Sequence, residues 1–77
     1  FGDWKMKIAK QVTSNNCLTA LQIKQVVSMF DFESDRLHYA KYAYDYSYDP
    51  NNYYKVNDAF EFESTIEELD EYISSRR

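Results

Sequence analysis

A short motif that occurs twice constrains the fold of this chain more than any other feature. Residues 30–34 read Phe-Asp-Phe-Glu-Ser, and residues 60–64 read Phe-Glu-Phe-Glu-Ser. The apolar residues before the two motifs recur with the same shift of 30 residues, so that Ile23, Val26 and Phe30 match Tyr53, Val56 and Phe60. A fixed period of this length is typical of helical-repeat proteins, in which each helix pair buries its apolar face against the next. The repeated unit is interpreted as a helix together with the turn that follows it.

A weaker repetition links the start of the chain to its middle. With a shift of 31 residues, Phe1, Met6, Ala9 and Lys10 match Phe32, Leu37, Ala40 and Lys41. A length of 77 residues allows one domain. We therefore predict a single all-α domain over residues 1–77, with about five short helices arranged as two helix pairs and a closing helix.

Capping residues and apolar spacing place the first two helices. Asp3 is a candidate N-cap for a helix that ends near Thr13, where the polar run 14–16 follows. Its predicted buried face carries apolar residues four positions apart, namely Trp4, Ile8 and Val12. Residues 19–22, Thr-Ala-Leu-Gln, have the form of a capping box, and the helix that follows has an apolar face made of Ile23, Val26, Val27 and Phe30.

The remaining helices are placed in the same way. Ser34 is the predicted N-cap of a third helix, whose inward side carries Leu37, Ala40, Ala43 and Tyr44, widened by Tyr39, Tyr42 and Tyr46. The turn signal at residues 49–52 precedes a short fourth helix that presents Tyr53, Val56 and Phe60. Residues 64–67 form a second capping box, with Ser64 as N-cap, for a last helix that turns Ile66, Leu69, Tyr72 and Ile73 inward.

One alternative concerns the tyrosines of the third helix. Tyr42, Tyr44, Tyr46 and Tyr48 alternate with other residues, as in a β-strand. The chain contains no second convincing strand to pair with them, and an unpaired strand leaves its backbone groups without hydrogen bonds. Helix is therefore the preferred interpretation, with fraying around Ser47.

Charge and residue content exclude several functions. The formal net charge is −4, and the Lys and Arg residues are scattered apart from a final pair, so we expect no nucleic-acid partner. The chain has one Cys, Cys17, and one His, His38. An intrachain disulfide is therefore impossible, and there is no convincing Cys–His catalytic pair or zinc site. No stretch resembles a signal peptide or a membrane span. We predict no catalytic residue, no cofactor and no enzymatic activity.

One segment resembles a calcium-binding loop in part. Asp45, Ser47, Asp49 and Asn51 have the spacing of the first four ligand positions. Pro50 stands where the loop needs Gly, and the twelfth position is Val56 where a bidentate Glu is needed. We therefore expect no metal site. The acidic pairs elsewhere, such as Glu67 and Glu68, lie in the first turn of a predicted helix, where the helix dipole stabilises them.

An ordered series of motifs is similar to a known bacterial family. It comprises residues 27–37, residues 40–44, Asp49, residues 51–54, Val56, residues 59–60, Phe62 and residues 66–69. Together these resemble the domain-of-unknown-function family DUF4476 over nearly the whole chain. The resemblance implies a module found at the C-terminal end of exported proteins from Bacteroidetes-like bacteria, and hence a periplasmic or extracellular location. It carries over no catalytic residue, because the family has no assigned activity.

The number of tyrosines suggests a binding surface. The chain contains eight Tyr residues, more than one small core is expected to absorb, although core filling with hydroxyls at the rim is an equally good explanation. The candidate binding face surrounds the predicted turn and comprises Tyr46, Tyr48, Asp49, Asn51 and Tyr54. The leading hypothesis is a module that binds an unknown protein or peptide. The alternatives are glycan binding and a purely structural spacer.

Overall fold

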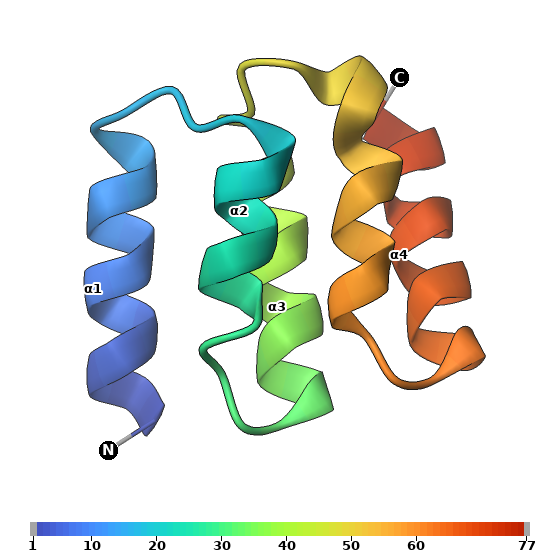
Figure 1. Ribbon diagram of the computed structural model, residues 1–77, viewed down its shortest axis with the longest axis horizontal. Coiled ribbons are helices and arrows are strands. Elements are labelled where there is room, and N and C mark those ends of the chain that lie inside the picture. The colour runs from blue at the N-terminus through green and yellow to red at the C-terminus, as the bar shows by residue number, and fades with distance from the viewer. Residues whose placement is uncertain (1, 77) are drawn as a thin grey trace.

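The computed structural model describes residues 2–76, which fold into five helices (Figure 1). These are α1 (Gly2–Ser14), α2 (Ala20–Val27), α3 (Glu33–Tyr44), the 3-10 helix η1 (Pro50–Ala59) and α4 (Glu63–Arg76). No strand occurs in this part of the chain, and the all-α prediction is confirmed.

The helices pack in two layers. Helices α1, α3 and α4 contact one another in that order and form the first layer. Helices α2 and η1 form the second layer, pack closely on each other and both contact α3 (Figure 1). Helix α1 stands at one end of the molecule, with α3 as its main neighbour. The centre of the fold is therefore α3 with α2 and η1 above it.

The core follows from the apolar faces of these central helices. Its fully buried side chains include Ile23 and Val27 of α2, Tyr39 of α3, Val56 of η1 and Leu69 of α4. Two core tyrosines satisfy their hydroxyl groups internally. The Tyr53 hydroxyl donates to the carbonyl oxygen of Ala40 at 2.5 Å, and the Tyr39 hydroxyl lies 2.6 Å from Oγ1 of Thr13. Tyr39 and Tyr53 are thus core residues.

Helix η1 shows why its apolar residues recur every third position. Tyr53, Val56 and Ala59 are all buried, and a 3-10 helix has three residues per turn, so these three side chains line one face. The predicted fourth helix is confirmed, with a 3-10 rather than an α geometry. Of its predicted inward residues Tyr53 and Val56 are buried in the helix, and Phe60 is buried just after its end.

The predicted helix starts are correct for α2 and wrong for three other helices. Thr19 forms the expected capping box with Gln22, because each side chain bonds to the other residue's backbone N–H. Asp3, Ser34 and Ser64 were predicted as N-caps, but α1, α3 and α4 begin at Gly2, Glu33 and Glu63, so these residues lie inside the helices.

The early start of α3 and α4 has a physical cause. Phe32 is extended and serves as N-cap of α3, since its carbonyl oxygen accepts the first helical hydrogen bond, from the Arg36 amide at 3.0 Å. The carbonyl oxygen of Phe62 plays the same part in α4, where it accepts from the amide of Ile66 at 3.3 Å. The Glu33 carboxylate of α3 accepts from the backbone amides of Glu61 and Phe62 at 3.1 Å each and so holds the turn that leads into α4, a contact that sequence spacing does not reveal.

The tyrosine segment is helical up to Tyr44 and then turns, so the strand alternative is wrong. Helix α3 ends at Tyr44, and the amides of Tyr46 and Ser47 close turns onto the carbonyl oxygens of Ala43 and Tyr44. Ser47 makes one isolated bridge to Leu18. The predicted end of the helix, near Ser47, lies three residues too late.

The predicted buried face of α1 is also wrong. Trp4, Ile8 and Val12 are exposed, and the side of α1 that packs on α3 carries the buried Thr13 together with the half-buried Met6 and Ala9. The hydrogen bond between Thr13 and the Tyr39 hydroxyl favours the rotation of α1 about its axis that places Thr13 against α3.

The two Phe-containing turns have matching environments. Phe30 and Phe60 are buried, Phe32 and Phe62 are exposed, and the next residue in each turn begins a helix. The predicted arrangement in helix-pair repeats is consistent with this match and remains a prediction.

Candidate functional site

The sequence-predicted binding face, called the tyrosine face below, comprises Tyr46, Tyr48 and Asp49 from the segment between α3 and η1, and Asn51 and Tyr54 from η1 itself. The side chains of Tyr48 and Tyr54 are 73% and 65% exposed, and that of Tyr46 is 38% exposed. Asn51 is exposed and Asp49 is half-buried. The ring of Tyr46 packs on that of Tyr42 of α3, with centroids 5.2 Å apart. Tyr48 and Tyr54 are therefore the most accessible aromatic groups of the face.

Hydrogen bonds to the backbone hold this segment in one conformation. The Tyr48 amide donates to the carbonyl oxygen of Leu18 at 2.8 Å. The Asp49 carboxylate accepts from the Ala20 amide at 2.8 Å and from the side-chain amide of Asn52 at 3.0 Å. Ala20 is the first residue of α2, so Asp49 caps that helix from a distant part of the chain. The hydrogen bonds from Asn52 and Ala20 lower the pKa of Asp49, which keeps the carboxylate ionised.

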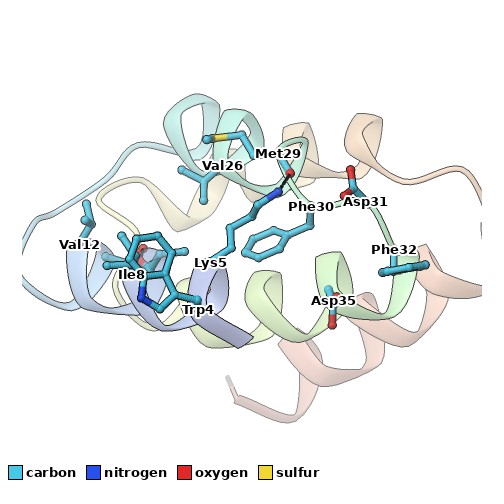
Figure 2. Close-up of a pocket in the computed structure, with 12 residues that line it drawn as sticks. Trp4, Lys5, Ile8, Val12, Val26, Met29, Phe30, Asp31, Phe32 and Asp35 are labelled. Carbon is cyan, nitrogen blue, oxygen red and sulfur yellow. Dashed lines mark hydrogen bonds between the residues drawn. The ribbon is translucent and has the colours of Figure 1, made fainter. Parts of the chain in front are cut away.

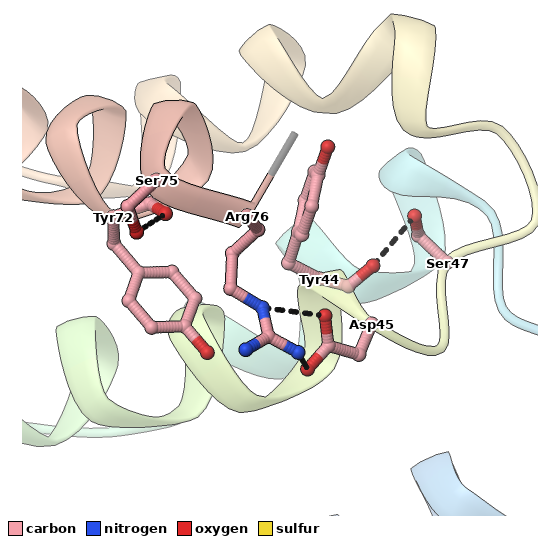
Figure 3. A network of polar contacts seen from close by, with 6 residues as sticks. All are labelled: Tyr44, Asp45, Ser47, Tyr72, Ser75 and Arg76. Carbon is pink, nitrogen blue, oxygen red and sulfur yellow. Dashed lines mark hydrogen bonds and ion pairs between the residues drawn. The ribbon is translucent and has the colours of Figure 1, made fainter.

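The partial calcium-loop pattern is occupied by contacts within the chain. Asp45 forms a two-pronged ion pair with Arg76 of α4, at 2.6 Å and 3.1 Å (Figure 3). Both oxygens of Asp49 are engaged as described above. Among residues 2–76, no group of three or more His, Cys, Asp or Glu side chains is placed to hold a metal ion.

Arg76 gives these polar contacts a structural role. Arg76 and Tyr72 both belong to α4, and the Arg76 guanidinium lies 5.6 Å from the centre of the Tyr72 ring. The same guanidinium binds Asp45, which comes just after the end of α3 (Figure 3). The carboxylate of Asp45 is therefore used to join α4 to α3.

A second surface, absent from the sequence prediction, is an apolar groove between α1 and α2. It encloses about 540 Å³. One wall comes from α1 and carries three apolar side chains, Trp4, Ile8 and Val12, which are 69%, 42% and 48% exposed. The opposite wall comes from the α2 side, with Val26 and the exposed Met29 (Figure 2).

One end of the groove carries its charged groups. The Lys5 ammonium donates to the carbonyl oxygen of Met29 at 2.8 Å and lies 6.0 Å from the centre of the Phe30 ring (Figure 2). Asp31 and Asp35 line the groove close to the exposed Phe32. Contiguous apolar surface of this kind is unusual on a folded domain and marks an interaction site or an incomplete core.

The family of the chain can now be stated. The family model described as a domain of unknown function, DUF4476, matches residues 1–73. The chain belongs to the DUF4476 family. Comparison with curated proteins and with solved structures found no match.

The single Cys and the single His of this DUF4476 domain both lie at its surface. Cys17 is exposed and lines a shallow polar hollow with Asn15, Asn16 and Tyr46. His38 of α3 lies 2.7 Å from the ammonium of Lys10 and is exposed. No helix in the described part of the domain is long and apolar enough to cross a membrane.

The sequence pattern identified the α1 side of the groove but assigned it to the core. The spacing of Trp4, Ile8 and Val12 correctly identified one apolar face of α1. Nothing in the periodicity says whether another element covers that face. The clue in the sequence was the polar Thr13 at the boundary of the stripe, which becomes the buried residue because Tyr39 offers it a hydrogen bond.

Proposed function

We propose that this DUF4476 domain is a non-enzymatic interaction module that binds a protein or peptide through the tyrosine face, which extends from the end of α3 into η1. The exposure of Tyr48 and Tyr54, the two least buried tyrosines of the face, carries this proposal. Tyrosine suits such a role because its rigid ring gives a large contact area and its hydroxyl gives a hydrogen bond at one end.

The fixed backbone of the segment supports the proposal. The bonds of Tyr48 to Leu18 and of Asp49 to Ala20 and Asn52 hold residues 48–52 before any partner arrives. A preordered segment loses little conformational entropy on binding, so more of the contact energy appears as affinity. The acidic net charge of −4 favours partners with basic or neutral contact surfaces.

Glycan binding is the second candidate. The hollow beside Tyr46 is also lined by Asn15 and Asn16, whose side-chain NH2 groups each donate one hydrogen bond to a backbone carbonyl of α1 and whose side-chain oxygens could accept from a sugar hydroxyl. Asp49 contributes less to this function than its position suggests, because both of its oxygens are already engaged. A structural spacer, with no ligand at all, is the third candidate.

The test compares two variants of matched chemistry. The double change Tyr48→Ser and Tyr54→Ser removes the proposed anchors, and Phe62→Ser removes an exposed aromatic residue from the turn between η1 and α4. Proteins captured from the source organism are identified by mass spectrometry, purified and titrated against each variant by calorimetry. We expect the double variant to weaken binding of the purified partner at least about tenfold, the effect of losing an interface hot spot, while Phe62→Ser leaves it unchanged.

Two results would contradict the proposal. Equal binding of the purified partner by the double variant and the original chain would remove the tyrosine face from the interaction. Binding to a defined oligosaccharide on a glycan array, lost in Tyr46→Ser, would establish the glycan alternative instead.

A further inference from the structure

Two basic side chains make corresponding contacts in this domain. The Lys5 ammonium donates to the carbonyl oxygen of Met29, and the Arg36 guanidinium donates through Nη1 to the carbonyl oxygen of Ala59, at 2.8 Å and 2.7 Å. The donors are 31 residues apart and the acceptors 30, the same shifts that relate the repeated motifs. Each contact joins the start of a first-layer helix, α1 or α3, to the residue before a buried Phe.

Arg36 makes two contacts that have no counterpart at Lys5. Its Nε donates to the carbonyl oxygen of Phe30 at 2.7 Å, and its Nη2 donates to that of Ser28 at 3.4 Å. Arg36 therefore binds the carboxyl ends of two neighbouring helices, α2 and η1. Lys5 binds the carboxyl end of α2 alone, which corresponds to the contact of Arg36 with η1. A helix corresponding to the contact of Arg36 with α2 would lie in the groove.

The residues of α1 that face the groove match covered residues of α3. With the shift of 31, Ile8 corresponds to Tyr39 and Val12 to Ala43. Tyr39 and Ala43 are fully buried, whereas Ile8 and Val12 are 42% and 48% exposed. Helix α2 packs on both α3 and η1. The groove lies beside α1 and α2 (Figure 2), as α2 lies beside α3 and η1 (Figure 1).

We propose that the groove is the binding site of a further amphipathic helix that precedes α1 in the same polypeptide. This helix runs parallel to α2, ends beside Lys5 and presents apolar residues at the spacing of Ile23, Val26, Val27 and Phe30. The Lys5 ammonium faces the negative end of its dipole. A basic residue in its last turn would have Asp31 or Asp35 as a partner.

A tethered source fits the groove better than a free peptide. A helix as short as α2, with eight residues, does not form by itself in water. Attachment through a turn of the length found between Phe30 and Phe32 gives the helix a high effective concentration at the groove, so it can fold on the domain. This inference is independent of the tyrosine face.

The experiment adds such a helix to the chain. A copy of residues 18–31 is fused directly before Phe1, because Phe1 matches Phe32, which follows residue 31. Trp4 is the only tryptophan, so its fluorescence reports on the groove. We expect a blue shift of the emission, a several-fold decrease in quenching by acrylamide and a higher melting temperature.

Two matched controls accompany the fusion. In the first, serines replace the copied Ile23, Val26, Val27 and Phe30, and protection of Trp4 should be lost. In the second, Ile8→Asp is introduced into the domain; it should leave the unextended chain folded, because Ile8 is exposed, and should abolish protection in the fusion. Tyr48→Ser with Tyr54→Ser should leave the protection unchanged, which separates this inference from the proposed function.

Three results would overturn the inference. Equal quenching of Trp4 in the fusion and its serine control would show that the groove does not accept the helix. Saturable protection by the same sequence as a free peptide would assign the groove to a helix in trans. Protection that rises with concentration of the unextended chain, together with dimer formation, would assign it to a second copy.

Discussion

Helices α1 and α2 carry apolar stripes of similar spacing, and their environments are opposite. Ile23 and Val27 of α2 have no solvent exposure, whereas Trp4, Ile8 and Val12 of α1 line an open groove. Helix α2 packs on both η1 and α3, while α1 has α3 as its main neighbour. The comparison shows that periodicity identifies an apolar face and leaves open whether the chain contains the element that covers it.

The largest expected effects distinguish the buried and exposed members of the Phe turns. Phe30→Ala or Phe60→Ala should each lower the free energy of unfolding by about 3 to 5 kcal/mol, because each change leaves a cavity in a small core. Phe32→Ala and Phe62→Ala should cost much less, since both rings are exposed. Urea unfolding of the four variants measures this, and dispensability of both Phe30 and Phe60 would contradict the core assignment.

The second prediction applies the comparison to one residue type. Ile23→Ala should lower the free energy of unfolding by about 2 to 5 kcal/mol, as is usual for a buried isoleucine. Ile8→Ala should change it by about 0.5 kcal/mol or less, because the side chain borders an open groove. Thermal melts of the pair give the difference directly. Similar losses would mean that the groove is closed in solution.

The sequence was sufficient for the fold class and for most inward residues of α2 and η1, although Val26, predicted to face inward, is half-buried and lines the groove. Periodicity and the Thr19 capping box contain that information locally. It failed where a distant group decides the outcome. The Glu33 carboxylate binds the backbone just before α4, which begins ahead of the predicted Ser64 cap. The Tyr39 hydroxyl bonds to Thr13, which is buried in place of Ile8. The exposure of Tyr48 also depends on a distant bond, to Leu18, which no local pattern contains.

The third prediction concerns the bond that sets the rotation of α1. The Thr13 hydroxyl donates to the carbonyl oxygen of Ala9 at 2.7 Å, so the Tyr39 hydroxyl is the donor in their 2.6 Å contact. Tyr39→Phe should cost about 1 kcal/mol, the usual worth of one hydrogen bond. Amide hydrogen exchange should show the loss mainly in α1. Uniform acceleration across all helices would instead indicate a general weakening of the core.

The fourth prediction is a pH dependence at the turn between η1 and α4. Partial burial raises the pKa of Glu33, but the amides of Phe62 and Glu61, with smaller contributions from Thr65 and Arg36, outweigh it and lower the pKa below its ordinary 4.5. A carboxyl with a lowered pKa stabilises the fold above its unfolded value and loses that contribution as the pH falls through its folded value.

Glu33→Gln tests this contribution. The variant should be less stable than the original chain near neutral pH, by at most about 1 kcal/mol for a partly solvated group. The difference should shrink as the pH falls below 4.5. Glu63→Gln, at an exposed position at the start of α4, is the control. A difference that is constant from pH 7 to about pH 3 would exclude an ionised Glu33 as its source.

The smallest expected effect on stability belongs to the residues with the largest proposed role in binding. Tyr48→Ser combined with Tyr54→Ser should change the free energy of unfolding by about 0.5 kcal/mol or less, because both rings are exposed and the backbone bonds of the segment remain. Tyr44→Ser should be clearly destabilising, since its half-buried ring meets the edge of the buried Tyr53 ring at 5.0 Å. If the double variant unfolds as readily as Tyr44→Ser, the two exposed tyrosines contribute to folding, and their presence no longer argues for a partner.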